Sequence, residues 1–129
     1  MNYNDILSNM IANIKNGYTS KAYSIKHLKS SVCMKVLDVL CQEGYITAYK
    51  ETDKYHIEII LKYDENNKSV ITNIVRISKP GRRIYVTVNE IIKLNEDGAL
   101  YIISTSKGVI SSKKIIEQKS GGELICKVI

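Results

Sequence analysis

The chain of 129 residues is 44% hydrophobic and 25% charged and carries a net charge of +6, a profile that indicates a folded globular protein and excludes a disordered one. Its length suits one ordinary domain or two small lobes and is too short for a large catalytic architecture. No apolar run approaches the roughly 18 residues of a membrane span, and the first residues lack the layout of a secretory signal or a transit peptide, so we expect a protein that works where it is made and has no membrane partner.

The charge is unevenly distributed along the chain. Residues 1–35 hold five lysines against one acid, residues 36–67 hold three lysines against seven acids, and residues 68–129 hold eleven lysines or arginines against five acids. The three segments therefore carry charges of +4, −4 and +6. A basic surface beside an acidic one steers polyanions to one side of a molecule, so this pattern favours a nucleic-acid partner.

The cysteines and histidines do not predict a metal site. Cys33, Cys41 and Cys126 lack C-x-x-C spacing, and His27 and His56 are the only histidines that could join them. We expect free, buried thiols in a reducing compartment, with no metal and no cofactor.

Two amphipathic helices are predicted in the first half. One covers roughly residues 4–16 and ends at Gly17, and the other begins at Ser30 or Ser31 and ends at Gly44. Their apolar residues recur at helical spacing: Leu7, Met10, Ile11 and Ile14 in the first helix, and Cys33, Val36, Leu37, Leu40 and Cys41 in the second.

Alternating segments predict three strands around these helices. Residues 23–28 lie between the helices, and residues 45–50 and 54–63 form a hairpin after the second helix. The residues expected on one face of the last strand are Tyr55, Ile57, Ile59, Leu61 and Tyr63. The first half is therefore predicted to be an α-β-α-β-β lobe, residues 1–65, with its boundary in the polar turn at residues 64–68.

Short strands separated by turns dominate the second half. A Pro-Gly turn in which Gly81 takes positive φ joins two of them, and a final strand places Leu124, Cys126 and Val128 on one face. The predicted strands are residues 69–77, 82–88, 99–103, 108–110 and 121–129, and a short capped helix is predicted over residues 111–119. Residues 66–129 are thus predicted to form a β-rich lobe with one short helix, which makes the fold class α+β.

One pair of residues raises the possibility of an enzyme. Ser104 and Lys107 form an S-x-x-K, the spacing of the nucleophilic serine and its lysine in penicillin-binding proteins. In those enzymes the serine opens a helix of a large domain, whereas here it lies between two short apolar strands, and an unactivated serine is a weak nucleophile. Because the sequence also lacks G-x-G-x-x-G, Walker and H-E-x-x-H motifs, we predict a protein that is not an enzyme and has no small-molecule substrate.

Hydroxyl, basic and aromatic residues favour RNA binding instead. The stretch S-T-S-K-G at residues 104–108 puts three hydroxyls and an amine in one turn, and such donors suit phosphate, ribose and base edges. Around the Pro-Gly turn, Lys79, Arg82 and Arg83 are suited to hold phosphates. Tyr85, expected on the same strand face as Arg83, could stack on an unpaired base.

Five segments, in this order and at this spacing, resemble the bacterial-type family of small-subunit ribosomal protein eight. They are DILSNMIANIKNG (5–17), VLCQEGYI (39–46), RISKPGRRIY (76–85), STSKGV (104–109) and SGGELICKV (120–128). The resemblance covers nearly the whole chain, and the combination of S-K-P-G-x-R-I-Y with S-T-S-K-G is specific. It implies a non-enzymatic RNA-binding protein with an N-terminal α/β lobe and a β-rich C-terminal lobe.

The resemblance further implies a structural constituent of the small ribosomal subunit, which binds a stem in the central domain of the ribosomal RNA and helps to assemble the platform. Neighbouring small-subunit proteins would be its other partners. The residues implied as RNA contacts are Ser104, Thr105, Ser106, Lys107 and Gly108, with Tyr85, Gly121, Gly122 and Glu123 nearby, and Asp5, Lys15 and Asn16 in the first helix. Lys15 equally suits the negative end of a helix dipole, and the family often has arginine or lysine where this chain has Asn13.

The alternative function is an RNA-binding regulator outside the ribosome, acting on a messenger RNA that mimics the same stem. The abundance of Ile, Asn, Lys and Tyr, with no Phe or Trp, suggests an AT-rich genome. The expected location is a ribosome in the bacterial cytoplasm or in the interior of an organelle, a mitochondrion or plastid, with a slight preference for an organelle.

Overall fold

The computed structural model describes residues 5–115 and 119–129. The chain forms two compact units, Met1–Thr72 and Asn73–Ile129, whereas the sequence placed the boundary after residue 65. Residues 66–72 belong to the first unit, in which Ser69 forms an antiparallel β-bridge with Tyr63. Ile71 in the same segment is buried. Within the described ranges, no helix is long and apolar enough to cross a membrane.

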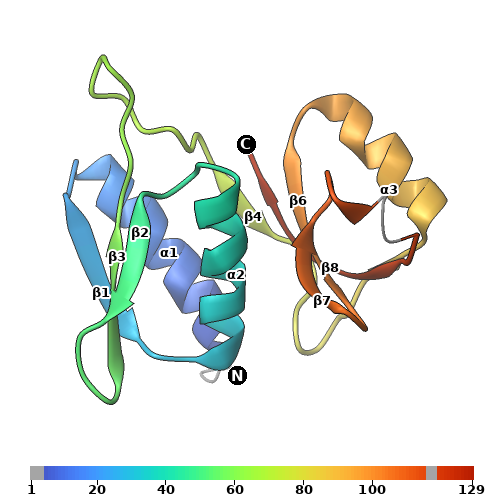
Figure 1. Ribbon diagram of the computed structural model, residues 1–129, viewed down its shortest axis with the longest axis horizontal. Coiled ribbons are helices and arrows are strands. Elements are labelled where there is room, and N and C mark those ends of the chain that lie inside the picture. The colour runs from blue at the N-terminus through green and yellow to red at the C-terminus, as the bar shows by residue number, and fades with distance from the viewer. Residues whose placement is uncertain (1–4, 116–118) are drawn as a thin grey trace. The chain divides into compact units, whose positions relative to one another are not determined.

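The first unit packs two helices against one antiparallel sheet (Figure 1). The helices are α1 (Ile6–Thr19) and α2 (Ser31–Gln42), and the strands are β1 (Ser24–Leu28), β2 (Ala48–Glu51) and β3 (His56–Ile60), in the order β1-β3-β2. The predicted order α-β-α-β-β is therefore confirmed. Ile57, Ile59 and Leu61 are buried, whereas Tyr55 precedes β3 and is 64% exposed, so the predicted strand face does not extend to Tyr55.

Helix α1 does not end at Gly17. It continues to Thr19, and Gly17 is buried where the helix crosses β1 and the segment after β3. A Cβ at this position would lie 2.7 Å from Ile25 Cγ2 and 2.9 Å from Leu61 Cδ1. The glycine is thus explained by close packing rather than by helix termination, which the sequence pattern does not distinguish.

Helix α2 turns its apolar face inward and ends as predicted. Gly44 adopts a φ of 81°, the left-handed conformation that commonly follows a helix. Cys33 is fully buried, whereas Cys41 is only half-buried. Burial still raises the pKa of the Cys41 thiol, which disfavours the reactive thiolate.

The second unit is built around the C-terminal strand. Its strands are β4 (Ile74–Arg76), β5 (Tyr85–Val86), β6 (Leu100–Thr105), β7 (Gly108–Ser111) and β8 (Gly122–Val128). The sheet order is β4-β8-β6-β7, and β5 also pairs with β8. The α+β class and the β-rich second lobe are confirmed, although β4 and β5 are shorter than the predicted strands 69–77 and 82–88.

The second unit has a helix where none was predicted. Helix α3 spans Val88–Leu94 and is followed by the 3-10 turn η1 (Asn95–Asp97). Thr87 and Glu90 form a capping box at its start, and its buried Ile91 packs in a core with Tyr101, Ile103, Ile115 and Leu124. Of the helix predicted over residues 111–119, Ser111 ends β7 and residues 112–114 form a turn, whereas Ile115 is helical and accepts a hydrogen bond from Lys119 N at 2.9 Å; residues 116–118 lie outside the described part of the chain.

A β-bulge in β8 changes which residues share a face. Ile102 pairs with Cys126, but the adjacent Ile103 pairs with Leu124. Because the bulge inserts one extra residue, Leu124 and Cys126 face opposite sides of the sheet. The prediction that Leu124, Cys126 and Val128 line one face was therefore wrong for Leu124.

Candidate nucleic-acid interface

Three residues that the sequence singled out lie in one row across the sheet of the second unit. Glu123 in β8 is the register partner of Tyr85 in β5 and of Ser104 in β6. Directly paired residues of antiparallel strands project from the same face. Tyr85 is 66% exposed, so the row offers an aromatic side chain for stacking beside a carboxylate and a hydroxyl.

Two glycines allow the strands of this row to approach each other. A Cβ on Gly122 would lie 2.2 Å from the carbonyl oxygen of Ser104, and a Cβ on Gly121 would lie 2.3 Å from that of Val86. Both distances are far below van der Waals contact with backbone atoms. Gly121 and Gly122 are therefore required because a side chain at either position would push the strands apart. This requirement holds whether or not either glycine contacts a ligand.

The turn between β6 and β7 presents Ser106 and Lys107. Thr105 Oγ1 donates a hydrogen bond to Gly108 O at 2.9 Å and accepts one from Lys107 N at 3.1 Å. Gly108 has a φ of 125°, a conformation that glycine adopts most readily. The hydroxyl of Thr105 is thus engaged within the turn, whereas Ser106 and Lys107 are exposed.

The second turn of the unit carries Lys79 and Arg82. These two residues exchange backbone hydrogen bonds of 3.0 and 2.9 Å, so Pro80 and Gly81 form a two-residue loop, and both cations are exposed. Gly81 is not among the glycines with positive φ, and the prediction of positive φ there was wrong. A proline at the second turn position is compatible with a type I turn, which needs no left-handed residue.

Arg83 and Glu123 contact each other. Arg83 Nη1 donates to both carboxylate oxygens of Glu123 at 3.2 and 3.1 Å. Glu123 also accepts a hydrogen bond of 2.5 Å from Ser78 Oγ. Sequence reasoning missed Ser78, because its position before the Pro-Gly turn carries no pattern that sets it apart.

Part of the hydroxyl-rich segment that follows is structural. Ser111 and Ser112 are buried, and Ser112 Oγ accepts a hydrogen bond from Tyr101 N at 3.1 Å. Lys113 and Lys114 are exposed. The cluster of polar residues at 104–114 therefore divides into a presented turn, a buried pair and two surface lysines.

In the first unit, α1 carries the remaining predicted contacts. Asp5 is the N-cap of α1, where its carboxylate accepts from Ser8 N at 3.3 Å and from Ser8 Oγ at 2.7 Å. Lys15 and Asn16 are exposed near the other end of the helix. The structure thus gives Asp5 a capping role and leaves Lys15 and Asn16 accessible.

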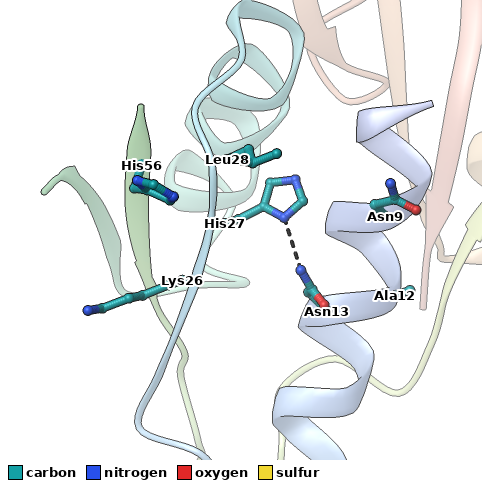
Figure 2. Close-up of a pocket in the computed structure, with 7 residues that line it drawn as sticks. All are labelled: Asn9, Ala12, Asn13, Lys26, His27, Leu28 and His56. Carbon is teal, nitrogen blue, oxygen red and sulfur yellow. Dashed lines mark hydrogen bonds between the residues drawn. The ribbon is translucent and has the colours of Figure 1, made fainter. Parts of the chain in front are cut away.

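A groove between α1 and β1 lies on the same unit (Figure 2). It has a volume of ≈ 470 Å³ and is lined by Asn9, Ala12, Asn13, Lys26, His27, Leu28 and His56. Asn13 and His27 Nδ1 are hydrogen-bonded at 3.0 Å, the contact drawn in Figure 2. Asn13 therefore anchors β1 to the helix.

The S-x-x-K residues Ser104 and Lys107, both within the described ranges, are not joined in the structure. Lys107 is exposed in its turn, and in the described part of the chain no hydrogen bond links its amine to Ser104. No cluster of three or more His, Cys, Asp or Glu side chains suited to a metal ion is found among residues 5–115 and 119–129. The fold and the interface define a class: a small two-unit α+β protein that presents hydroxyl, aromatic and basic side chains on preformed turns and a sheet row.

Comparison with known proteins identifies the family of the chain. The family model described as ribosomal protein S8 matches residues 5–129. A small ribosomal subunit protein uS8 from Campylobacter hominis is 41% identical over 128 residues, covering 97% of this chain and 98% of the relative. Proteins of the same name from Bartonella bacilliformis (42% identical) and Rickettsia rickettsii (38% identical) each align over 99% of both chains. The chain belongs to the ribosomal protein S8 family.

Proposed function

We propose that this protein is a structural constituent of the small ribosomal subunit and binds its ribosomal RNA. The observation that carries the proposal is the match to the S8 family over residues 5–129, together with a second unit that presents RNA-compatible side chains. More specifically, the protein binds a stem in the central domain of that RNA and helps to assemble the platform beside neighbouring small-subunit proteins. It acts without catalysis, cofactor or small-molecule substrate, in a ribosome of a bacterium or of an organelle.

The chemistry of the row and the two turns supports RNA recognition. Tyr85 offers an exposed ring on which an unpaired base can stack. Ser104 and Ser106 can donate to phosphate, ribose or base edges without steric bulk. These contacts depend on shape and hydrogen bonding, so they discriminate an irregular stem from a regular helix.

Basic side chains supply affinity that is independent of sequence. Lys79, Arg82 and Lys107 are exposed at the tips of the two turns, and each phosphate neutralised releases condensed counterions. In the first unit, Lys15 and Asn16 are exposed on α1 and suit a further segment of the RNA backbone. The hydroxyl and aromatic contacts thus give selectivity for one stem, whereas the basic side chains attract any RNA through its phosphates.

A matched pair of variants tests this division. We expect Ser106→Ala to weaken binding to the cognate stem by about 2- to 10-fold, the effect of one lost hydrogen bond, with an unchanged salt dependence. Lys113→Ala removes an exposed cation outside the proposed recognition turn. It should mainly reduce the slope of log K against log salt, by about 0.7–0.9 if Lys113 contacts one phosphate.

Binding is measured by titration of a central-domain stem at several salt concentrations, beside a control stem whose irregular pairs are replaced by Watson–Crick pairs. The wild type should prefer the irregular stem, and Ser106→Ala should lose part of that preference. Equal losses on both stems for both variants would contradict a recognition role for Ser106. Equal binding of the two stems by the wild type would contradict the proposed function itself.

A further inference from the structure

The carboxylate of Glu123 is held from two sides within the second unit. Ser78 Oγ donates to Glu123 Oε2 at 2.5 Å, and Arg83 Nη1 lies 3.1 Å from the same oxygen and 3.2 Å from Oε1. The Glu123 side chain is only 19% exposed, whereas that of Arg83 is 54% exposed. A shielded carboxylate is stabilised by such charge-assisted partners, and its charge is compensated inside the protein.

Ser78 connects this pair to the backbone of the sheet. It is 1% exposed, and its N–H donates to the carbonyls of Leu124 and Ile125 at 3.1 and 3.3 Å. Its hydroxyl, while donating to Glu123, accepts from Ile84 N at 3.1 Å. The carbonyl of Ser78 accepts a further hydrogen bond from Arg76 Nε. The buried hydroxyl of Ser78 therefore links both ends of the 78–84 hairpin, Ser78 and Ile84, to Glu123 in β8.

The geometry defines what this network positions. The hairpin carries Lys79 and Arg82 at its tip, and Tyr85 follows directly in β5. Beyond its own cross-turn bonds, the hairpin is joined to β8 by the Ser78 contacts, by the Arg83–Glu123 pair and by Leu124 N donating to Ile84 O at 2.9 Å. Loss of the ion pair would leave Glu123 shielded and short of a cationic partner, and would free one side of the hairpin.

We propose that Arg83 and Ser78 are positioning residues, which act through Glu123 to hold the 78–84 hairpin and Tyr85 in place for RNA, and that Arg83 does not neutralise a phosphate. The proposal rests on the proposed function, that the second unit binds RNA. The two adjacent arginines then have different roles: Arg82 at the tip of the hairpin binds RNA phosphates, and Arg83 pairs with Glu123 inside the protein. The row of Tyr85, Glu123 and Ser104 then carries little net charge, so its contacts are insensitive to salt.

The test compares Arg82→Gln with Arg83→Gln, two substitutions of identical chemistry one residue apart. Affinity for the central-domain stem is measured at five or more salt concentrations. Arg82→Gln should reduce the slope of log K against log salt by about 0.7–0.9. Arg83→Gln should weaken binding by about 2- to 10-fold, the effect of one lost hydrogen bond at a half-exposed pair, and leave the slope unchanged. A slope reduced equally by both substitutions would overturn the proposal.

A second readout does not depend on RNA. In the free protein, amide hydrogen exchange at Ile84 and Leu124 should be faster in Arg83→Gln and in Ser78→Ala than in the wild type, and unchanged in Arg82→Gln. Unchanged exchange at these amides in Arg83→Gln would overturn the positioning role even if binding were weakened. If the wild type does not select the stem but exchange responds as stated, the proposed function fails while the positioning of the hairpin stands.

Discussion

Replacement of Gly122 by alanine tests how closely β8 must approach β6. In the present structure, a Cβ at Gly122 would lie 2.2 Å from Ser104 O and 2.9 Å from Ser104 C. A carbon and a carbonyl oxygen are in van der Waals contact at roughly 3.2–3.4 Å, so the strands would have to separate by about 1 Å. Because both colliding atoms belong to backbone, no side-chain rotation can relieve the clash.

The expected loss of stability follows from two opposing effects. Overpacking a well-packed site destabilises a protein by about 1–3 kcal/mol. Alanine also restricts the unfolded chain, which offsets this by up to about 0.4–1 kcal/mol where the native backbone accepts it. We therefore expect Gly122→Ala to lower the free energy of unfolding by about 1–2 kcal/mol. RNA binding should fall as well, since the displaced strand carries Ser104.

The assay is urea unfolding followed by circular dichroism, with Gly81→Ala as the matched control. A Cβ on Gly81 meets nothing within 4 Å, and this glycine does not adopt positive φ. Gly81→Ala should leave stability unchanged or raise it by up to about 1 kcal/mol. If Gly122→Ala proved as stable as Gly81→Ala, the close approach of β8 and β6 described here would be refuted.

Three further outcomes follow from particular contacts. Burial lowers the pKa of His27, so the folded state binds a proton less readily than the unfolded state, and the free energy of unfolding should fall as the pH drops below about 6.5. The variant His27→Gln should flatten this pH dependence between pH 7 and 5.5. A profile as steep as that of the wild type would contradict the prediction. Tyr18→Phe removes a hydroxyl that forms hydrogen bonds with two backbone groups, and it should lower the free energy of unfolding in urea by about 1–3 kcal/mol. Tyr63→Phe loses only one such bond and should have a smaller effect, so the reverse order would contradict this prediction. Thr105→Val removes both hydrogen bonds of the Thr105 side chain in the β6–β7 turn and should weaken RNA binding by about 3- to 10-fold in titrations. Thr105→Ser keeps the hydroxyl and should have a smaller effect. Equal effects of the two substitutions would contradict a role of Thr105 in closing the turn.

Local patterns predicted most elements of the fold. The spacing of Leu7, Met10, Ile11 and Ile14 identified α1, because only one face of a helix can meet the sheet, and all four residues are buried. The errors occurred where two physical causes share one pattern. Gly17 was interpreted as a helix end but is required for packing.

The missed helix had a signal in the sequence. The predicted strand over residues 82–88 includes Thr87 and Val88, which are the N-cap and the first residue of α3. The capping box of Thr87 and Glu90 is nevertheless written as T-x-x-E in front of an apolar run. Capping was the stronger determinant here, since β-branched residues are only mildly unfavourable in helices.

The candidate site was only partly predictable. Hydroxyl, aromatic and basic residues indicated the two turns, since both turns are local in sequence. The alignment of Tyr85, Glu123 and Ser104 depends on the register of three strands and on a bulge at Ile125, and register between distant strands has no local signature. The pairing of Arg83 with Glu123 follows from the same register, which is why both residues resembled independent RNA contacts.

The most direct test of the central claim is where the protein sediments in a lysate of its own cells. Gradient fractions would be blotted for the protein with and without a magnesium chelator, at low and moderate salt. A structural constituent of the small subunit should co-migrate with that subunit in moderate salt, and should shift with it when chelation unfolds the particle. A position among free proteins or light complexes under all these conditions would contradict the claim.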